Sequence, residues 1–162
     1  MIIANKAQSQ LLCSTAELKS FLLAGRAVVT LKSLKTQEHF TFKIQLDGST
    51  SSTPPSRRWH VKVLTYAGNY QSIGQIYESQ EMNFARPAKM TVGPHSPSFR
   101  AFKWFWVGVR GGQEVPRHLL EVYHEGKCGR CGRPLTHPES IKSGIGPECK
   151  QLMEGAKTLQ EF

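Results

Sequence analysis

The sequence of 162 residues contains no uninterrupted apolar stretch long enough to cross a membrane, which takes about 20 residues. Its first residues have neither a basic leader nor a long apolar segment, so a secretory signal is not expected. Cysteine is scarce, with four residues in all. We therefore expect a cytoplasmic protein with no membrane partner, whose reduced cysteines are free to bind a metal ion.

Signatures of the common catalytic sites are also missing. The chain has no phosphate-binding P-loop, no dinucleotide fingerprint, no nucleophile elbow and no H-E-x-x-H pair. The tripeptide His-Pro-Glu at 137–139 resembles part of a zinc deaminase motif, but it follows the C-x-x-C pair, whereas the deaminase order is the reverse. We expect that the protein is not an enzyme.

Acidic residues are scarce in one part of the chain. Residues 1–113 hold 14 Lys and Arg but five Asp and Glu, whereas residues 114–162 hold seven of each. The net charge of +9 therefore belongs to the first part. The sequence predicts a basic domain at 1–113 with a polyanionic partner and a metal-binding module at 114–162. The alternative, that the charge only serves solubility, stays open.

Hydrophobic periodicity predicts an α+β fold, an antiparallel sheet with a covering helix. A helix is expected from Ser14, which can cap it, to Gly25. A second one begins after Ser96 and carries a stripe of apolar side chains (Phe99, Phe102, Trp106 and Val109). Strands are predicted at 26–33, 38–46, 59–67, 71–79 and 88–93. Short connections favour antiparallel pairing with one solvated face.

Basic residues of the predicted sheet face and of the second helix are the candidates for binding a partner. Trp104 falls away from the apolar stripe of that helix, so it is a candidate platform for stacking on a base, with a second packing contact as the alternative. The complete set is Lys32, Lys43, Arg57, Arg58, Lys62, Arg100, Lys103 and Trp104.

Three of the four cysteines cluster in the sequence near the C-terminus. Cys128 and Cys131 form a C-x-x-C knuckle, and Cys149 follows early in an expected helix at 147–155. A knuckle followed by a helix that supplies a further thiolate is typical of zinc-knuckle and treble-clef-like modules. We expect one structural zinc ion, because zinc is the usual metal of thiolate-rich sites.

The fourth ligand is predicted at His124, four residues before the knuckle. His137 is the main alternative, but it lies in a stretch that resembles a helix start, with Thr136 and Glu139 as a capping box. His118, a carboxylate or water also stay open. A complete set of four protein ligands would make the metal a structural element, since catalytic zinc keeps one position for water.

The stretch "HEGKCGRCGRPLTHPESIKSGIGPEC", 124–149, resembles a small cysteine-containing domain of uncharacterised bacteriophage and prophage proteins. The rest of the chain resembles, more loosely, the usual companion of that domain. In that family a histidine often precedes the knuckle, which supports His124. The resemblance implies an accessory role in an infected bacterial cell. Two functions follow as hypotheses. One is nucleic-acid binding through the basic domain. The other is counter-defence, an anti-CRISPR-like or other anti-immune inhibition of a host defence complex or capture of a nucleotide messenger.

Overall fold

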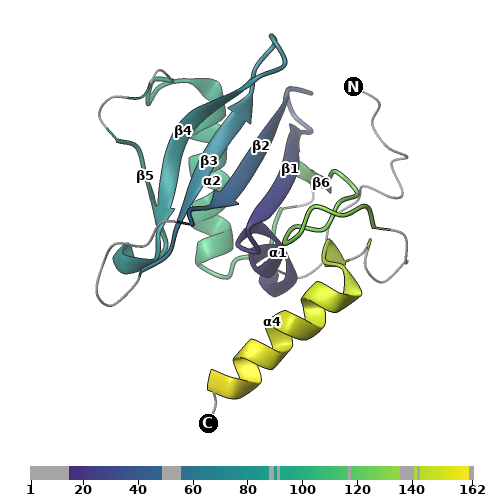
Figure 1. The fold of residues 1–162 in the computed structure, drawn as a ribbon. Helices are drawn as coiled ribbons and strands as arrows, with labels where there is room; N and C mark the ends of the chain where they lie inside the picture. Colours follow the sequence, from purple (N-terminus) through teal and green to yellow (C-terminus); the bar gives the residue numbers. More distant parts are fainter. Residues whose placement is uncertain are drawn as a thin grey trace.

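The computed structural model describes residues 15–48, 56–87, 90, 92–116, 118–135, 141 and 143–160. A six-stranded antiparallel sheet is its centre, with strands in the order β5-β4-β3-β2-β1-β6 (Figure 1). The strands are β1 (Arg26–Ser33), β2 (His39–Leu46), β3 (Arg58–Leu64), β4 (Tyr70–Tyr77), β5 (Asn83–Ala85) and β6 (Leu120–His124). The helices are α1 (Thr15–Leu22), the 3-10 turn η1 (Glu78–Gln80), α2 (Pro97–Arg110) and α4 (Pro147–Gln160). The α+β prediction is confirmed.

Strands β1 to β4 form because their apolar residues alternate with polar ones. Val29, Phe42 and Val61 are buried at alternate positions of their strands, as the pattern of period two requires. Successive strands pair as a meander, and β6 adds to the free edge of β1, with Val29 opposite His124. The residues of β6 lie in the range predicted as the metal-binding module, so the sheet crosses the predicted boundary at residue 113.

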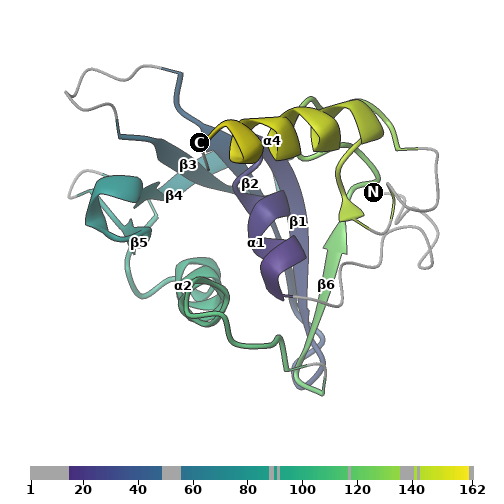
Figure 2. The same cartoon turned by 90° about the horizontal axis from the view of Figure 1, so that it is seen from below.

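Both α1 and α2 cover the same face of the sheet (Figure 2). Ser96 caps α2 by accepting a hydrogen bond from the Phe99 N–H at 3.4 Å, as predicted. The helix then buries Phe102 and Trp106 against the sheet, and the Phe102 ring lies 5.1 Å from that of Phe42. The Ser14 cap expected for α1 lies outside the described residues.

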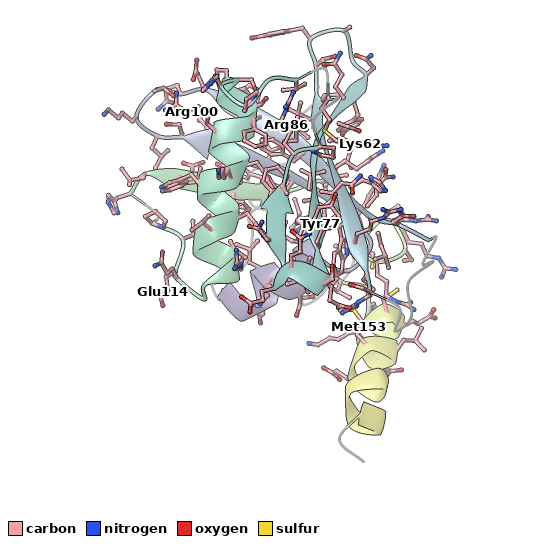
Figure 3. The ribbon with its side chains drawn as sticks, turned by 90° about the vertical axis from the view of Figure 1, so that its left-hand side faces the viewer. Lys62, Tyr77, Arg86, Arg100, Glu114 and Met153 are labelled. Carbon is pink, nitrogen blue, oxygen red and sulfur yellow. The ribbon has the colours of Figure 1, made fainter. Side chains whose placement is uncertain are left out.

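The other side of the sheet, which we call the open face, points away from α1 and α2 (Figure 3). It carries Thr30, Lys32, Thr41, Lys43, Lys62 and Tyr70. α4 projects beyond one end of the sheet and leaves Lys62 uncovered (Figures 1 and 3). None of the helices in the described part of the chain has the length and apolar character that a membrane crossing requires.

Two details of the strand prediction were wrong. The described residues of the stretch 88–93 (Met90, Val92 and Gly93) are not in a strand, and the fifth strand lies earlier, at Asn83–Ala85. β6 was not predicted at all. Its hydrogen-bonding partner β1 lies about 90 residues away in sequence, so no turn motif between neighbouring strands indicates this pairing.

Candidate metal centre

The knuckle is a tight backbone hairpin. Lys127 pairs with Pro134, the Cys128 N–H donates to the Arg133 carbonyl at 2.8 Å, and the Gly132 N–H donates to the Cys128 carbonyl at 2.9 Å. This geometry turns two thiols toward one point. α4 begins at Pro147, whose ring suits the first position of a helix, and so places Cys149 in the first turn. There the helix dipole favours a thiolate.

The structure brings all three predicted cysteines together. Their sulfur atoms lie within 4.8 Å of one another. Tetrahedral zinc–thiolate bonds of about 2.3 Å would set neighbouring sulfur atoms roughly 3.8 Å apart, so this cluster needs little movement to hold a metal ion. Cys128 and Cys149 are buried and Cys131 is half-buried. The donor set fits a thiophilic metal.

The surrounding N–H groups favour a thiolate at Cys128. Its sulfur accepts hydrogen bonds from the N–H groups of Arg130 at 3.4 Å and Gly146 at 3.3 Å. Burial by itself raises the pKa of the Cys128 thiol, but these donors together with Cys131 outweigh it and lower the pKa to about 7. At Cys149 burial raises the pKa, and the Arg130 guanidinium, 3.6 Å from the sulfur, opposes this shift. Cys128 is therefore the thiol whose surroundings favour the loss of its proton to a metal ion.

His124 is not one of the clustered ligands, which corrects the sequence-based assignment. It is buried, its Nδ1 accepts from the Gly126 N–H at 2.8 Å, and its Nε2 donates to the Ile141 carbonyl at 2.6 Å. A histidine ligand needs one ring nitrogen with a free lone pair, and here both nitrogens are engaged. His124 instead ties the end of β6 to the chain that returns toward Cys149. The alternative, His137, lies outside the described residues.

Because His124 is held neutral, the protein should lose stability in mild acid. Burial lowers the pKa of His124 below its ordinary value, against an opposing effect of the Ile141 carbonyl. Below pH 6.5 His124 becomes protonated in the unfolded chain but stays neutral in the folded protein. The free energy of unfolding therefore falls as the pH falls toward the lowered pKa of the folded state. Urea unfolding of the wild type between pH 7.5 and 5.5 should show this loss, with a slope of at most about 1.4 kcal/mol per pH unit.

His124→Gln is the comparison that isolates this contribution. The variant should be less stable at every pH, but its stability should depend less on pH between 6.5 and 5.5. The cysteines are the same in both proteins, so the pH dependence of metal binding cancels when both are measured with excess metal. An unchanged pH dependence would show that His124 is not the titrating group.

The metal-binding part is joined to the sheet through the ring of Phe21. A Cβ atom added at Gly129 or Gly144 would lie 2.7 or 2.6 Å from Phe21 Cδ2, so only glycine allows the ring to enter between them. The Phe21 and His124 rings lie 5.9 Å apart. The Arg26 N–H also donates to the Gly129 carbonyl at 2.6 Å. The knuckle and the start of β1 are therefore one packed unit.

The predicted partner-binding residues divide between two faces. Lys32, Lys43 and Lys62 lie on the open face. Arg100, Lys103 and Trp104 lie on the exposed side of α2, on the opposite side of the sheet. The structure does not bring these two groups into one patch.

Arg57 and Arg58 are held by acids at the far end of the sheet. Arg57 forms an ion pair with Glu78 at 2.7 Å, and this interaction lowers the pKa of Glu78. Arg58 donates to Asp47 at 2.5 Å, and His60 shares the same carboxylate oxygen. Their charge is partly neutralised, and this weakens their case as phosphate ligands.

Tyr70 is a residue that sequence reasoning missed. The Lys43 ammonium lies 4.6 Å from the centre of its ring, a distance typical of cation–π contacts. β3 lies between the two strands involved, so the contact depends on a side chain reaching across a strand. No spacing within the sequence signals it.

One comparison with known proteins gives a match. The model of a family of unknown function (DUF6011) matches residues 119–153. This range includes β6, the knuckle, all three clustered cysteines and the first half of α4. No curated protein and no solved structure matches the chain significantly. The chain is therefore similar to this family over the part that contains the cysteine cluster.

Proposed function

We propose that the protein binds nucleic acid through the open face and that a single zinc ion stabilises the fold without taking part in chemistry. The observation that carries this proposal is the pair Lys43 and Lys62, which are direct cross-strand neighbours on β2 and β3. Like charges in this position destabilise a sheet. A polyanionic partner would offset that repulsion.

The two lysines have no carboxylate partner in the part of the chain that the structure describes. The ion pairs there involve Arg57, Arg58, His60 and Arg133. Lys43 instead lies over the Tyr70 ring, which keeps its ammonium on the open face. Two lysines that lack counter-ions on an uncovered sheet are suited to phosphates.

Polar neighbours extend this surface. Thr30 is half-buried, and its hydroxyl lies 2.8 Å from that of the buried Thr41, while Lys32 continues the line toward the end of β1. Burial, with a smaller contribution from Glu125, raises the pKa of Tyr70, so its hydroxyl stays protonated and can donate. Hydroxyl donors beside lysines are common in contacts to phosphate and sugar.

Zinc as the metal, and its structural role, belong to the same proposal. Three thiolates support zinc over harder metals. The cluster lies at the junction of β6, the knuckle and α4, where loss of the ion would loosen packing. The fourth ligand is left open, with His137 as the candidate from the sequence.

Replacing the lysine pair tests the nucleic-acid proposal. Lys43→Ala with Lys62→Ala should weaken binding to DNA or RNA about ten-fold or more at low salt and should reduce the slope of log affinity against log salt by about two. Lys127→Ala with Lys150→Ala removes the same charge from exposed positions of the metal-binding part and should have little effect. Fluorescence anisotropy over a salt series measures both.

Two results would contradict the proposal. One is an absence of binding to single-stranded DNA, duplex DNA and RNA at low salt. The other is an equal loss in the control variant, which would reduce the effect to net charge. A stoichiometric protein partner recovered from a bacterial lysate without nucleic acid would instead favour the counter-defence hypothesis, which rests on the same charge and on the resemblance to phage proteins.

A further inference from the structure

Trp104 is the exposed member of the three tryptophans. Its side chain is 53% exposed, whereas Trp59 and Trp106 are fully buried and donate their indole N–H to the carbonyls of Leu23 and Met82. An indole left in solvent on a rigid helix gives up the burial that usually stabilises this residue. The exposed side chains of Val107 and Leu119 line surface hollows that Trp104 also lines, and an exposed apolar patch of this kind marks a binding surface.

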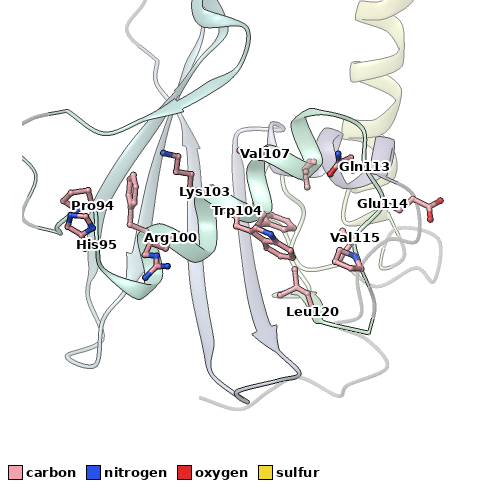
Figure 4. A pocket seen from close by; sticks show the side chains of 15 residues that line it. Pro94, His95, Arg100, Lys103, Trp104, Val107, Gln113, Glu114, Val115 and Leu120 are labelled. Carbon is pink, nitrogen blue, oxygen red and sulfur yellow. The ribbon is translucent and has the colours of Figure 1, made fainter.

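Two hollows border Trp104. One, of about 850 Å³, follows the outer side of α2 from His95 to Val115 (Figure 4). The other, of about 600 Å³, lies between α2 and the hairpin that joins β1 to β2, where Lys35 and Phe40 border it. Arg100, Trp104 and Leu120 line both hollows. Trp104 is therefore a half-exposed planar side chain at the border of two hollows.

The charged residues around Trp104 are mostly basic, which favours an anionic ligand. α2 contains no acidic residue. Arg100 lies one helical turn before Trp104 and Lys103 directly precedes it. Neither has an acidic partner among the residues described. Two acidic residues line the hollows. Glu38 borders the second hollow, and Glu114 is at the far end of the first one, away from His95 and Arg100 (Figure 4). A planar apolar surface beside guanidinium and ammonium groups fits a base with its phosphate.

A basic path connects this site with the open face. Lys32 lies on the open face near the end of β1, between His39 of β2 and Glu121 of β6. Lys35 follows in the hairpin turn and borders the second hollow. Beyond the turn, Arg100 borders that same hollow. The path therefore leads from Lys43 and Lys62 around the hairpin to Trp104.

We propose that the protein binds single-stranded nucleic acid, which passes around the β1–β2 hairpin and stacks one base on Trp104. This inference rests on the proposed function and narrows it to a substrate class. A duplex keeps its bases paired and stacked inside the helix, so only an unpaired base can place its face on the indole. The phosphates on either side of that base are then within the reach of Arg100 and Lys103.

Binding of a 15-residue oligo-dT and of a 15-base-pair duplex to the full chain tests this inference. Trp104→Ala should weaken oligo-dT binding about ten-fold or more and leave duplex binding within two-fold. Leu152→Ala removes an exposed apolar side chain on α4 that lines neither hollow, and it should change neither affinity. Oligo-dT should also quench wild-type tryptophan emission, and this quenching should disappear in Trp104→Ala. Thermal melting confirms that both variants are folded.

The outcomes separate this inference from the proposed function. If the wild type binds both nucleic acids and Trp104→Ala binds oligo-dT as tightly as the wild type, the stacking site is wrong while the open-face proposal stands. If the wild type binds neither oligo-dT nor the duplex, both the stacking site and the open-face proposal are wrong. If Leu152→Ala weakens oligo-dT binding as much as Trp104→Ala, the loss reflects exposed apolar surface in general, and base stacking on Trp104 is wrong. A protein partner that requires Trp104, with no effect of the variant on oligo-dT, would make this groove a protein-docking surface and would overturn the inference.

Discussion

Cys128→Ser is expected to abolish metal binding and to unfold the knuckle. Cys128 is the most buried of the three cysteines. Its sulfur accepts hydrogen bonds from the N–H groups of Arg130 in the knuckle and Gly146 in the turn before α4. Serine is a poor ligand for a thiophilic metal, because its hydroxyl is not ionised near neutral pH. We expect the metal content to fall from about one ion per chain to near zero, with a loss of about 3 kcal/mol or more in unfolding free energy.

Chelation provides an independent measure of the same coupling. A chelator should lower the melting temperature of the wild type toward that of Cys128→Ser and should change the variant little. Cys13→Ser is the matched control, because it also replaces one thiol by a hydroxyl and Cys13 is absent from the predicted ligand set. It should keep the full metal content. Full metal content in Cys128→Ser, or purified wild type without metal, would refute the metal centre.

Most of the sheet could be predicted because its signals are local. The residues of β1 to β4 alternate between apolar and polar, and Ser96 with Pro97 marks the start of α2. β5 has three residues, too few for a periodic pattern, and β6 forms only because a distant strand offers its edge. Local pattern thus predicts elements well and long-range pairing poorly.

The metal site shows the same division between local and distant information. The spacing of Cys128 and Cys131 fixes a knuckle, and the Pro-Glu-Cys turn fixes the third thiol, so all three were found. His124 was misassigned because sequence distance to the knuckle says nothing about the Ile141 carbonyl, which occupies Nε2. The alternation of Leu120, Val122 and His124 was the available signal, since it places His124 at an inward position of a strand.

The partner-binding residues were grouped by charge alone, and the fold separates them. The sequence shows the sign of the charge but not the face of the sheet on which each basic residue lies, because that depends on which face the helix covers. Once α2 covers one face, Lys43 and Arg100 lie on opposite sides of the sheet. The β1–β2 hairpin, with Lys32 and Lys35, becomes the feature that can join them.

Phe21→Ala is expected to weaken both the fold and the metal centre. The ring is fully buried and fills the space above Gly129 and Gly144, and its loss would leave a cavity between α1 and the knuckle. Removing a buried phenylalanine costs about 3–5 kcal/mol. Because Gly129 belongs to the knuckle and its N–H donates to the Gly144 carbonyl at 2.9 Å, the cavity would also release the backbone that positions the thiols. Metal affinity should fall together with stability.

Leu22→Ala separates this coupling from general destabilisation. Leu22 is also fully buried on α1, and its truncation should cost a comparable 2–5 kcal/mol. Competition with a metal-binding dye, under conditions where both variants are folded, should show weaker metal binding for Phe21→Ala than for Leu22→Ala. Equal affinities would mean that the knuckle holds its geometry without support from α1. A selective loss would mean that the metal centre and the sheet stabilise each other through one aromatic ring, so that metal removal would reach the β1 edge that the proposed nucleic-acid path follows.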